Sequence, residues 1–485
     1  MMAHAALRQW PVDQRDSLPL SLWSSHEIAA ATNGQASRAF QASGVEMDSR
    51  DVRLGDLFIA LKGEAMDGHR FIDQAFANGA IAAITDRPIA QPHVLVEDTT
   101  KALHALAAHA RDRAQAVRIG VTGSVGKTGV KEAIFAALDR ASRGASHRSV
   151  RSYNNHVGVP LSLARMPARS RFGVFEMGMN HAGEIEVLTQ HVRPNVAVIT
   201  TIAPAHIENL GSLEAIADAK AEIFGGLDDG GTAVIPADIP QTEGLVELAR
   251  AVGANVVTFG KTEGADVRLL DAIPSANGGS LVTADMGDRR LCYSVAEPGE
   301  HWIQNSLCVM AAVRAAGGDL GAAGLSLAEM GGLKGRGARH NIAVPGGKAL
   351  LIDEAYNANP ASMRATLRQL GQTPATRRIA VLGAMKELGD LADRFHSQLS
   401  EPLADAKVDH AILVGDEMRG LARQLGKAPL GALGNEIGFT HCDGVQEAIS
   451  ALEEYGIAAG DAVLVKGSNS VGLGTLVSHF VGLDE

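Results

Sequence analysis

The sequence predicts an α/β protein of three domains, with doubly wound parallel sheets in the second and third. The length of 485 residues exceeds the size at which one hydrophobic core keeps growing. Apolar strand-like runs alternate with helical segments along most of the chain, which indicates parallel βαβ crossovers. A glycine-rich stretch then separates two such alternating regions. We expect a small α/β N-terminal domain, a central doubly wound parallel-sheet domain and a C-terminal Rossmann-like α/β domain, with the boundaries 1–108, 109–333 and 334–485.

Composition and charge exclude several functional classes. Hydrophobic residues make up 46% of the chain and charged residues 20%, as in an ordinary globular protein. The net charge is -11 and no Lys/Arg-rich run occurs, so nucleic-acid binding is not expected. Three distant cysteines argue against a disulfide framework. We find no signal-peptide h-region and no apolar stretch of ~18 residues, so a cytoplasmic protein without a membrane span is expected.

The first hundred residues predict a small α/β unit. A segment from Phe71 to Asn78 has helical spacing and ends at Gly79, a typical helix stop. Three short apolar runs around it predict strands, and these are Asp56–Ala60, Ala80–Thr85 and His93–Val96.

The second unit opens with a strand at Val117, a glycine-rich turn and a helix. Further strand and helix alternation predicts a parallel sheet, and residues 266–294, with their Gly, Asn and Asp turns, predict a β-hairpin insert. The strands expected here after the first are Phe172–Glu176, Val196–Ile202, Thr232–Ile235 and Val256–Phe259.

A third alternating region follows a helix at Gln304–Ala316 and the glycines between Gly331 and Gly347. We interpret these glycines as a hinge between the second and third domains. The strands expected after the hinge are Ala349–Asp353, Arg378–Leu382, Ala411–Val414 and Ala462–Val465.

The clearest motif is a phosphate-binding loop between strand and helix. Glycines at 120, 123 and 126 let backbone N–H groups turn inward as an anion nest at a helix N-terminus. Lys127 is placed to reach the β- and γ-phosphates and the Thr128 hydroxyl to reach Mg²⁺. The strict GxxxxGK[ST] pattern would place its first glycine at position 121, which is valine. A glycine-rich packing turn and a dinucleotide-binding loop are the alternatives, and Lys-Thr at this position disfavours both.

Polar groups follow other predicted strands. Glu176 ends an apolar run and is a candidate Mg²⁺ ligand, since Mg²⁺ prefers hard oxygen donors. His206 follows another strand end, and Lys220 lies on the next helix; an ordinary loop histidine and a solvated lysine are the alternatives. The run Asp353–Pro360 places a polar turn at a strand's carboxyl end, where α/β domains bind ligands, although a simple Asx/Pro turn is possible there.

These motifs, in this order, resemble the Mur ligases of peptidoglycan synthesis over most of the chain. The loop GVTGSVGKT (120–128) is similar to the variant in that family, which also lacks the strict first glycine. Three segments resemble the branch of the family that adds D-alanyl-D-alanine, namely EMGMNHAGEIE (176–186), IAPAHIENLGSLEAIADAKAEIF (202–224) and DEAYNANPASM (353–363). DSRDVRLGDLFIALKGEAMDGHRFIDQA (48–75) is similar to the family's UDP-binding domain.

The resemblance implies roles for individual residues. Thr128, Glu176, His206 and a carbamoylated Lys220 would hold Mg²⁺, with Lys127, Lys220 and His206 as the catalytic set. The family usually has Asn where Trp302 stands, which puts adenine contacts from that position in doubt. The residues expected to contact ATP are Gly123, Ser124, Gly126, Lys127, Thr128, Asn305, Arg336, Asp353, Tyr356 and Asn357. Those expected to contact the UDP-linked substrate are Ser49 and Arg50 by the uridine, and Asn154 and Asn155 near the reacting centre.

The implied reaction joins two small molecules at the expense of ATP. The carboxylate of UDP-N-acetylmuramoyl-tripeptide (UDP-MurNAc-tripeptide) would attack the γ-phosphate of ATP, and the amine of D-Ala-D-Ala would then displace phosphate. Closure of the third domain over the second would exclude water from the acyl phosphate. A monomer acting with ATP and Mg²⁺ is expected, without a nucleic-acid or membrane partner.

Three alternatives compete with this interpretation. The ligase that adds the third peptide residue shares the UDP-binding segment, but its DNPR-type motif does not occur in the sequence. A folate or cyanophycin-type glutamate ligase would not explain that UDP-binding segment. A P-loop switch or transporter motor would leave DEAYNANP unexplained, and no obvious Walker-B strand follows the loop.

Overall fold

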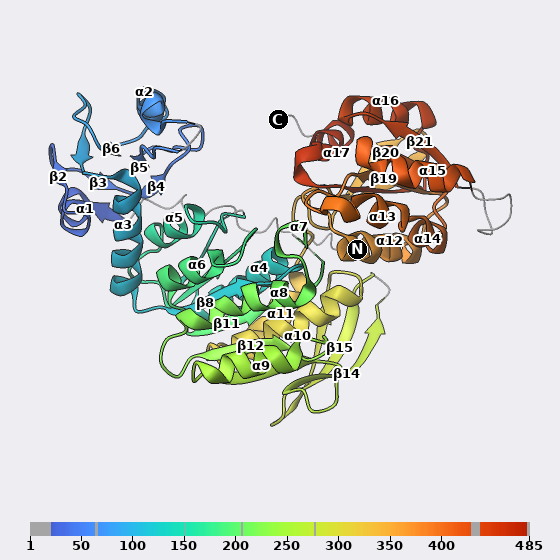
Figure 1. Cartoon of the computed structure of the whole chain (residues 1–485), viewed down its shortest axis with the longest axis horizontal. Coiled ribbons are helices and arrows are strands. Elements are labelled where there is room, and N and C mark those ends of the chain that lie inside the picture. Colours follow the sequence, from blue (N-terminus) through green and yellow to red (C-terminus); the bar gives the residue numbers. More distant parts are fainter. Residues whose placement is uncertain are drawn as a thin grey trace, which may run out of the picture. The chain divides into compact units, whose positions relative to one another are not determined.

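The computed structural model describes residues 21–63, 66–150, 152–204, 207–275, 278–427 and 437–482. The chain divides into two compact units (Figure 1). The first comprises Met1–Ala116 and Ser149–Arg171, and the second comprises Val117–Arg148 and Phe172–Glu485. The first unit is therefore discontinuous in sequence, which the linear boundaries at 108/109 and 333/334 do not represent. Those boundaries stay a prediction.

The first unit contains a five-stranded sheet with one antiparallel edge strand. Its strands, in spatial order, are β2 (Gln35–Ala36), β7 (His93–Leu95), β6 (Ala82–Thr85), β5 (Asp56–Ile59) and β4 (Gly44–Glu46). Only β2 runs antiparallel to its neighbour. A two-stranded pair lies beside it, β1 (Trp23–Ser24) with β3 (Gln41–Ala42). The three strands predicted from apolar runs are confirmed as β5, β6 and β7, and the predicted helix is confirmed as α2 (Ile72–Ala77).

Helices of the first unit start at side chains that satisfy the free N–H groups of the first turn. Ser24 and Glu27 form a capping box at α1 (Ser25–Thr32), and Asp98 caps α3 (Thr99–Ala114). The core joins segments that are distant in sequence, because α5 (Gly158–Ala164) is buried along its whole length and packs on α3. The Trp23 indole N–H donates to the Ala164 carbonyl at 2.8 Å, which ties the inserted segment to the N-terminal part.

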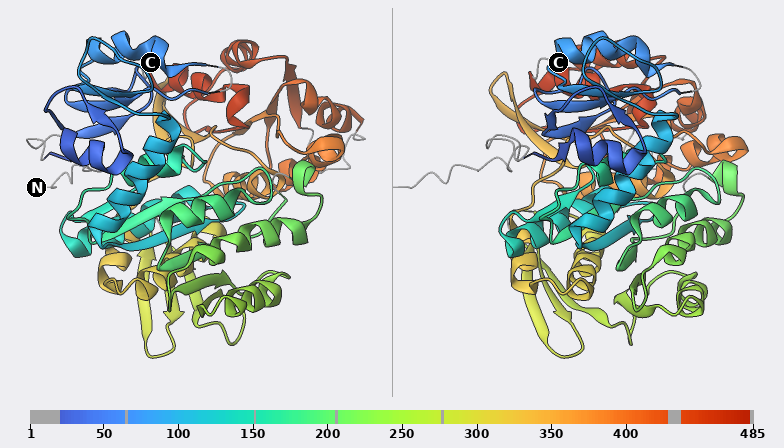
Figure 2. Two further views of the ribbon diagram at one scale, coloured as in Figure 1. Left: turned by 60° about the vertical axis from the view of Figure 1, so that its left-hand side comes forward. Right: turned by 90° about the vertical axis from the view of Figure 1, so that its left-hand side faces the viewer.

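The second unit begins with a nine-stranded sheet. Its strands, in spatial order, are β16 (Arg290–Val295), β15 (Ser280–Asp285), β14 (Val267–Pro274), β13 (Asn255–Gly260), β12 (Thr232–Pro236), β11 (Val196–Ile199), β8 (Val117–Thr122), β10 (Phe172–Glu176) and β9 (Ser146–Arg148). All pairs are parallel except β14–β15 and β15–β16. The predicted insert is therefore a three-stranded antiparallel extension of this sheet, visible as the long yellow-green ribbon in Figure 2.

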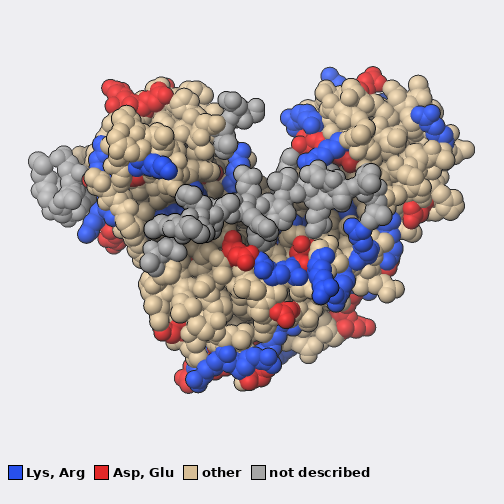
Figure 3. Space-filling view, turned by 180° about the vertical axis from the view of Figure 1, so that it is seen from behind, with Lys and Arg blue, Asp and Glu red and all other residues tan. Residues whose placement is uncertain are grey.

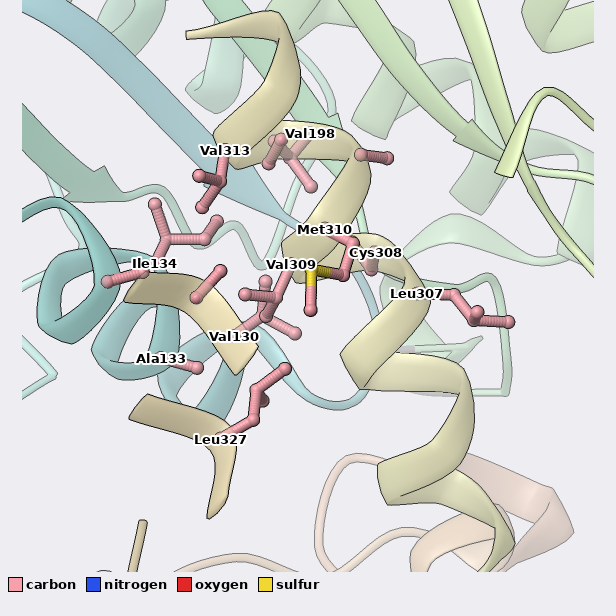
Figure 4. Close-up of a cluster of buried hydrophobic side chains, with 14 of the residues drawn as sticks. Val130, Ala133, Ile134, Val198, Leu307, Cys308, Val309, Met310, Val313 and Leu327 are labelled. Carbon is pink, nitrogen blue, oxygen red and sulfur yellow. The ribbon is translucent and has the colours of Figure 1, made fainter. Parts of the chain in front are cut away.

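Helices cover both faces of this sheet. Three of them, α4 (Lys127–Ser142), α10 (Glu300–Ala315) and α11 (Leu320–Glu329), pack together through buried aliphatic side chains (Figure 4). Val130, Ile134 and Val309 have no exposed surface, so the helix that follows the phosphate loop is anchored on an apolar layer. The remaining helices are α6 (Glu184–Val192), α7 (Ile207–Leu210), α8 (Leu213–Ala221) and α9 (Thr242–Ala251).

A six-stranded sheet forms the C-terminal part of the second unit. Its spatial order is β17 (Ala338–Val344), β18 (Gly347–Glu354), β22 (Ala462–Lys466), β19 (Arg378–Gly383), β20 (His410–Val414) and β21 (Gly438–Cys442). The four predicted strands are confirmed, while β17 and β21 were missed. The pair β17–β18 is antiparallel with Val344 opposite Gly347, so Gly346 lies in its hairpin turn and Gly347 begins β18. Both glycines therefore belong to this hairpin, and the hinge stays a prediction for the glycines that precede β17.

Helices lie on both faces of the C-terminal sheet. Buried side chains of α12 (Pro360–Gln372), α13 (Ala392–Ser397), α14 (Ser400–Asp405) and α15 (Arg419–Lys427) share one core, and those of α16 (Val445–Tyr455) and α17 (Leu473–Val481) share another. The helices after β18 and β22 therefore lie on opposite faces. Such switch points open a crevice at the carboxyl ends of the strands, and the Asp353–Pro360 turn lies there.

The surface carries charges of both signs. On the face shown in Figure 3, basic and acidic side chains are interspersed rather than gathered by sign. In the described part of the chain, no helix combines the length and the apolar character that crossing a membrane requires.

Candidate functional site

The phosphate loop connects β8 to α4 and needs glycine at two positions. Gly123 has φ +145 and Gly126 has φ +89, conformations that side chains with a Cβ rarely adopt. A Cβ on Gly123 would lie 1.9 Å from the Thr200 Oγ1, and one on Gly126 would lie 2.9 Å from the Asn305 Oδ1. The end of β11 and the start of α10 thus crowd the loop from outside, and only glycine fits against them.

Hydrogen bonds tie the loop to the segment after β11. The Ser124 N–H donates to the Thr201 carbonyl at 2.9 Å, and the Ser124 hydroxyl donates to the Ala203 carbonyl at 2.9 Å. The Thr200 hydroxyl donates to the Val125 carbonyl at 2.5 Å. The Ser124 side chain, predicted to contact ATP, therefore also holds the loop in shape. His206 lies outside the described residues, two positions beyond the end of this segment.

Lys127 folds back over the loop. Its ammonium donates to the Gly123 carbonyl at 2.7 Å. Burial lowers the pKa of Lys127, the nearby Glu176 carboxylate opposes this shift, and the Arg336 guanidinium adds to it. The positive charges of Lys127 and Arg336 therefore both act at the loop, and together they would favour binding of a polyanion there.

A fully buried carboxylate lies behind the loop. Glu176 ends β10, is 0% exposed and pairs in register with Val121 of β8. The Thr128 hydroxyl donates to its Oε2 at 2.9 Å, and the Lys131 ammonium lies 3.6 Å from the same oxygen. The structure thus brings together Thr128 and Glu176, two of the predicted metal ligands.

Lys220 is buried rather than solvated. It lies on α8 with 2% exposure, so the alternative of a surface lysine is wrong. Burial lowers the pKa of Lys220 well below its ordinary value, the charge of Lys127 adds to this shift, and Glu222 opposes it. A lysine in this environment favours the neutral amine, the form that reacts with CO₂.

The Asp353–Pro360 turn is hydrogen-bonded to the segment that precedes β17. Asp353 is 2% exposed, and its two carboxylate oxygens accept from the N–H groups of Gly335 at 2.7 Å and Ala355 at 3.1 Å. Between these anchors the Arg336 guanidinium lies over the ring of Tyr356, 4.3 Å from its centroid. Arg336, Asp353 and Tyr356, all predicted to contact ATP, therefore form one cluster.

Asn357 and Asn305 occupy different places. The Asn357 carbonyl accepts from the buried ammonium of Lys466 at 2.9 Å, at the carboxyl end of β22. Asn305 lies on α10 against Gly126 of the phosphate loop. Trp302, one turn earlier, is 8% exposed and packs against Gly129 as part of the apolar core. Its ring is therefore part of the packing around α4.

The residues predicted to contact the UDP-linked substrate all belong to the first unit. Ser49 is buried, and its carbonyl accepts from the Asn78 amide at 2.8 Å. Arg50 is exposed and forms an ion pair with Asp48 at 2.6 Å. The Asn155 side-chain oxygen accepts a 2.9 Å bond from the Gly158 N–H at the start of α5, and Asn154, half-buried, precedes it.

Two lysines of the site were missed in the sequence. Lys131 and Lys466 are both almost completely buried, and each forms an ion pair with a glutamate. Lys131 follows Lys127 by four positions on α4, and this spacing places both side chains on one helix face. This four-residue spacing from Lys127 is the feature of the sequence that could have identified Lys131 as a residue of the site. Nothing local in the sequence distinguishes Lys466 from a strand-end surface lysine.

The donor set fits Mg²⁺ better than a soft metal. Among the described residues, no group of three or more His, Cys, Asp and Glu side chains could hold a metal ion. The Thr128 hydroxyl and the Glu176 carboxylate are hard oxygen donors 2.9 Å apart. Mg²⁺ takes few protein ligands of this type and keeps several waters. The residues present therefore fit a magnesium ion bound together with nucleotide phosphates.

Comparison with models of known protein families shows which family the chain belongs to. A model described as the Mur ligase middle domain matches residues 121–313. The model of the Mur ligase glutamate ligase domain matches residues 342–469, and that of the Mur ligase family catalytic domain matches residues 41–117. The chain belongs to the Mur ligase family. The predicted family and the α/β fold class are thereby confirmed, and with them the prediction of a ligase.

Relatives of this Mur ligase carry a more specific name. It is 31% identical to the UDP-N-acetylmuramoyl-tripeptide–D-alanyl-D-alanine ligase of Rickettsia prowazekii, over 95% of this chain and 100% of the relative. It is 36% identical to the ligase of the same name from Synechocystis, over 90% of this chain and 91% of the relative.

Solved structures of MurF are similar to this Mur ligase over most of their length. MurF from Acinetobacter baumannii is 30% identical with a TM-score of 0.81, over 96% of this chain and 100% of that chain. MurF from Thermotoga maritima in complex with ADP is 27% identical with a TM-score of 0.71, over 90% of this chain and 97% of that chain.

Proposed function

We propose that this Mur ligase joins D-alanyl-D-alanine to UDP-MurNAc-tripeptide at the expense of ATP. The observation that carries the proposal is the phosphate loop, in which Lys127 and Thr128 lie around the buried Glu176. Relatives named for this reaction match nine-tenths of the chain or more, which supports the substrate assignment.

The loop would neutralise charge during carboxylate activation. The tripeptide carboxylate and the γ-phosphate of ATP are both anions and repel each other. The Lys127 ammonium and the N–H groups of the loop stabilise the transferring phosphoryl group. A bound Mg²⁺ supplies further charge neutralisation at the phosphate oxygens. The carboxylate displaces ADP from the γ-phosphate and becomes an acyl phosphate. The D-Ala-D-Ala amine then attacks the acyl carbon, loses a proton and displaces phosphate as the amide bond forms.

Lys220 would be carbamoylated. Its neutral amine attacks CO₂, the new N–C bond forms, and one proton leaves to solvent. The product is a carbamate anion, which places an oxygen donor next to Lys127 where the neutral amine stood. The buried position and the lowered pKa of Lys220 support this role. A carbamate would serve with Thr128, Glu176 and His206 as a ligand of Mg²⁺ or of its waters.

The remaining predicted residues would bind the two nucleotides. We assign Asn305, Arg336, Asp353, Tyr356 and Asn357 to ATP, together with Gly123, Ser124 and Gly126 of the loop. Ser49 and Arg50 are assigned to the uridine part of the other substrate, and Asn154 and Asn155 to the region near its reacting centre. We further propose that the enzyme acts as a monomer in the cytoplasm.

The identity of the accepted amine tests the substrate assignment. The purified enzyme is supplied with ATP, Mg²⁺ and UDP-MurNAc-tripeptide, and the product is analysed by mass spectrometry. D-Ala-D-Ala should be incorporated. The control supplies UDP-MurNAc-dipeptide with lysine or meso-diaminopimelate, and product only in that reaction would assign the chain to the preceding step.

A further inference from the structure

A series of neighbouring charged side chains extends from the phosphate loop through α4, with its buried end at Lys131 and Glu176. Lys131 is 0% exposed, and its ammonium lies 3.6 Å from the Glu176 Oε2 and 3.2 Å from the Glu132 Oε1. The Glu132 Oε2 in turn lies 2.7 Å from the Arg148 Nε. The sequence of groups is Arg148, Glu132, Lys131 and Glu176, so positive and negative charges alternate.

The four groups form a connected series of ion pairs. Arg148 at the end of β9 pairs with Glu132, and Lys131 pairs with both Glu132 and Glu176. Both members of the Lys131–Glu176 pair are completely buried, and a buried charge without a partner is strongly destabilising. Glu176 therefore has a buried cationic partner in Lys131, and the charge of Lys127 also acts on it.

We propose that Lys131 is the resident counter-cation of Glu176 and makes binding of a divalent metal conditional on the nucleotide. A metal bound at Glu176 alone would add two positive charges next to a buried ion pair, within a few ångströms of an ammonium. Nucleotide phosphates in the loop supply the negative charge that makes the metal favourable. This inference rests on the proposed role of Glu176 as a metal ligand, and Lys131 acts as a positioning and charge-balancing residue.

The hydrogen bond from Thr128 to Glu176 supports a positioning role for Lys131. Thr128 and Lys131 lie three positions apart on α4, so both reach the same carboxylate oxygen from one helix face. Lys131 thereby holds the Glu176 side chain in one orientation and also compensates its negative charge. Lys127, one turn earlier, is directed to the Gly123 carbonyl instead, so the two lysines of this helix have separate tasks.

Binding of Mn²⁺ to the full-length enzyme tests the proposal without any peptide substrate. Mn²⁺ affinity is measured by electron paramagnetic resonance, with and without ADP, in the wild type and in Lys131→Met. A unit charge removed within ~4–6 Å changes the proton affinity of a carboxylate by about tenfold or more, and a divalent ion should respond at least as strongly. Lys131→Met should therefore bind Mn²⁺ without ADP about tenfold more tightly or better than the wild type.

Controls separate this effect from a general loss of structure. Lys131→Arg keeps the charge and should retain weak Mn²⁺ binding without ADP. Arg140→Met removes a partly exposed cation from the same helix, where Arg140 forms an ion pair with Glu329, and should leave the affinity unchanged. Lys131→Gln provides a polar neutral variant if the methionine variant does not fold. Unchanged or weaker Mn²⁺ binding in the neutral variants would overturn the proposal.

The wild type provides a test that needs no variant. The proposal predicts strong positive coupling, in which ADP tightens Mn²⁺ binding and Mn²⁺ tightens ADP binding by the same factor. Equal Mn²⁺ affinity with and without ADP would contradict it. Because only Mn²⁺ and ADP are used, the outcome is independent of whether D-Ala-D-Ala is the substrate. Failure of ligation with intact coupling would reject the proposed function alone.

Discussion

Three lysines determine the electrostatics around the phosphate loop, of which Lys131 and Lys220 are buried and Lys127 is half-buried. Lys127 lies over the loop, Lys131 lies behind it against Glu176, and Lys220 lies nearby on α8. Buried lysines are rare because removing an ammonium from water is unfavourable unless a partner or a neutral form compensates. The three lysines are compensated differently. Lys127 donates to the Gly123 carbonyl, Lys131 forms an ion pair with Glu176, and Lys220 has a lowered pKa that favours its neutral form.

Replacing Lys127 should remove most of the catalytic rate. In Lys127→Ala we expect kcat/KM to fall by about 100-fold or more, equivalent to about 3 kcal/mol of transition-state stabilisation. The measurement is the rate of ADP release with both substrates present. Lys101→Ala, which removes an exposed lysine of α3, should retain the wild-type rate. A near-normal rate in Lys127→Ala would reject the phosphate-loop assignment.

Replacing Lys220 tests the carbamate. Lys220→Ala should lose activity and regain part of it when a short-chain carboxylate is added, since the carboxylate can occupy the place of the carbamate. Lys220→Arg cannot form a stable carbamate and should remain inactive without such rescue. Activity measured across a series of carboxylate concentrations decides, and full activity of either variant would exclude the role.

Glu297 should make stability depend on pH. Burial raises the pKa of Glu297 to about 7, Arg339 opposes this shift and Glu354 adds to it. The folded state therefore holds this proton more tightly than the unfolded state, so its stabilisation is complete below the ordinary carboxyl pKa and is lost as pH rises through about 7.

The variant Glu297→Gln should remove that loss. Relative to the wild type, Glu297→Gln should gain up to about 3 kcal/mol of unfolding free energy between pH 5 and pH 8. Urea denaturation at the two pH values provides the measurement. An identical difference between the two proteins at both pH values would show that Glu297 titrates normally.

At the scale of elements, the phosphate loop depends on space as well as on backbone conformation. Gly123→Ala would place a Cβ 1.9 Å from the Thr200 Oγ1, so the loop or the end of β11 must move. We expect ADP binding to weaken by about tenfold or more, roughly 1.4 kcal/mol, which is within the cost of such strain. Calorimetric titration with ADP measures this effect.

A second glycine variant controls for a general loss of structure. Gly230 also has a positive φ, +74, but a Cβ added there would meet nothing within 4 Å. Gly230→Ala therefore carries the conformational strain without the collision and lies outside the loop. Its ADP affinity should equal that of the wild type, and equal weakening in both variants would indicate a non-specific loss of structure.

Strand and helix alternation was predictable for the parallel strands because each is a short apolar run. β17 and β21 are half-exposed edge strands with mixed residues, and their pattern does not stand out from a loop. The phosphate loop was likewise predictable from Gly126, Lys127 and Thr128. Lys131 was not, because its function comes from a strand, β10, that lies far away in sequence.

At the scale of the whole molecule, the first unit needs both of its segments. Leu161 and Ala164 of α5 are fully buried in the core built by residues 21–116. A fragment of residues 1–116 alone should therefore lack a cooperative unfolding transition, because it exposes the apolar surface that α5 covers. Joining residues 149–171 to it through a flexible linker should restore the transition, as followed by circular dichroism during heating. Cooperative unfolding of the shorter fragment would contradict this assembly.

The dependence of ATP turnover on the two ligation substrates tests the central claim most directly. ADP release is measured with UDP-MurNAc-tripeptide and D-Ala-D-Ala together, with each alone, and with neither. The proposed mechanism predicts one ADP for each amide bond formed and sustained turnover only when both substrates are present. Sustained ATP hydrolysis without the tripeptide substrate, or no stimulation by D-Ala-D-Ala, would contradict it.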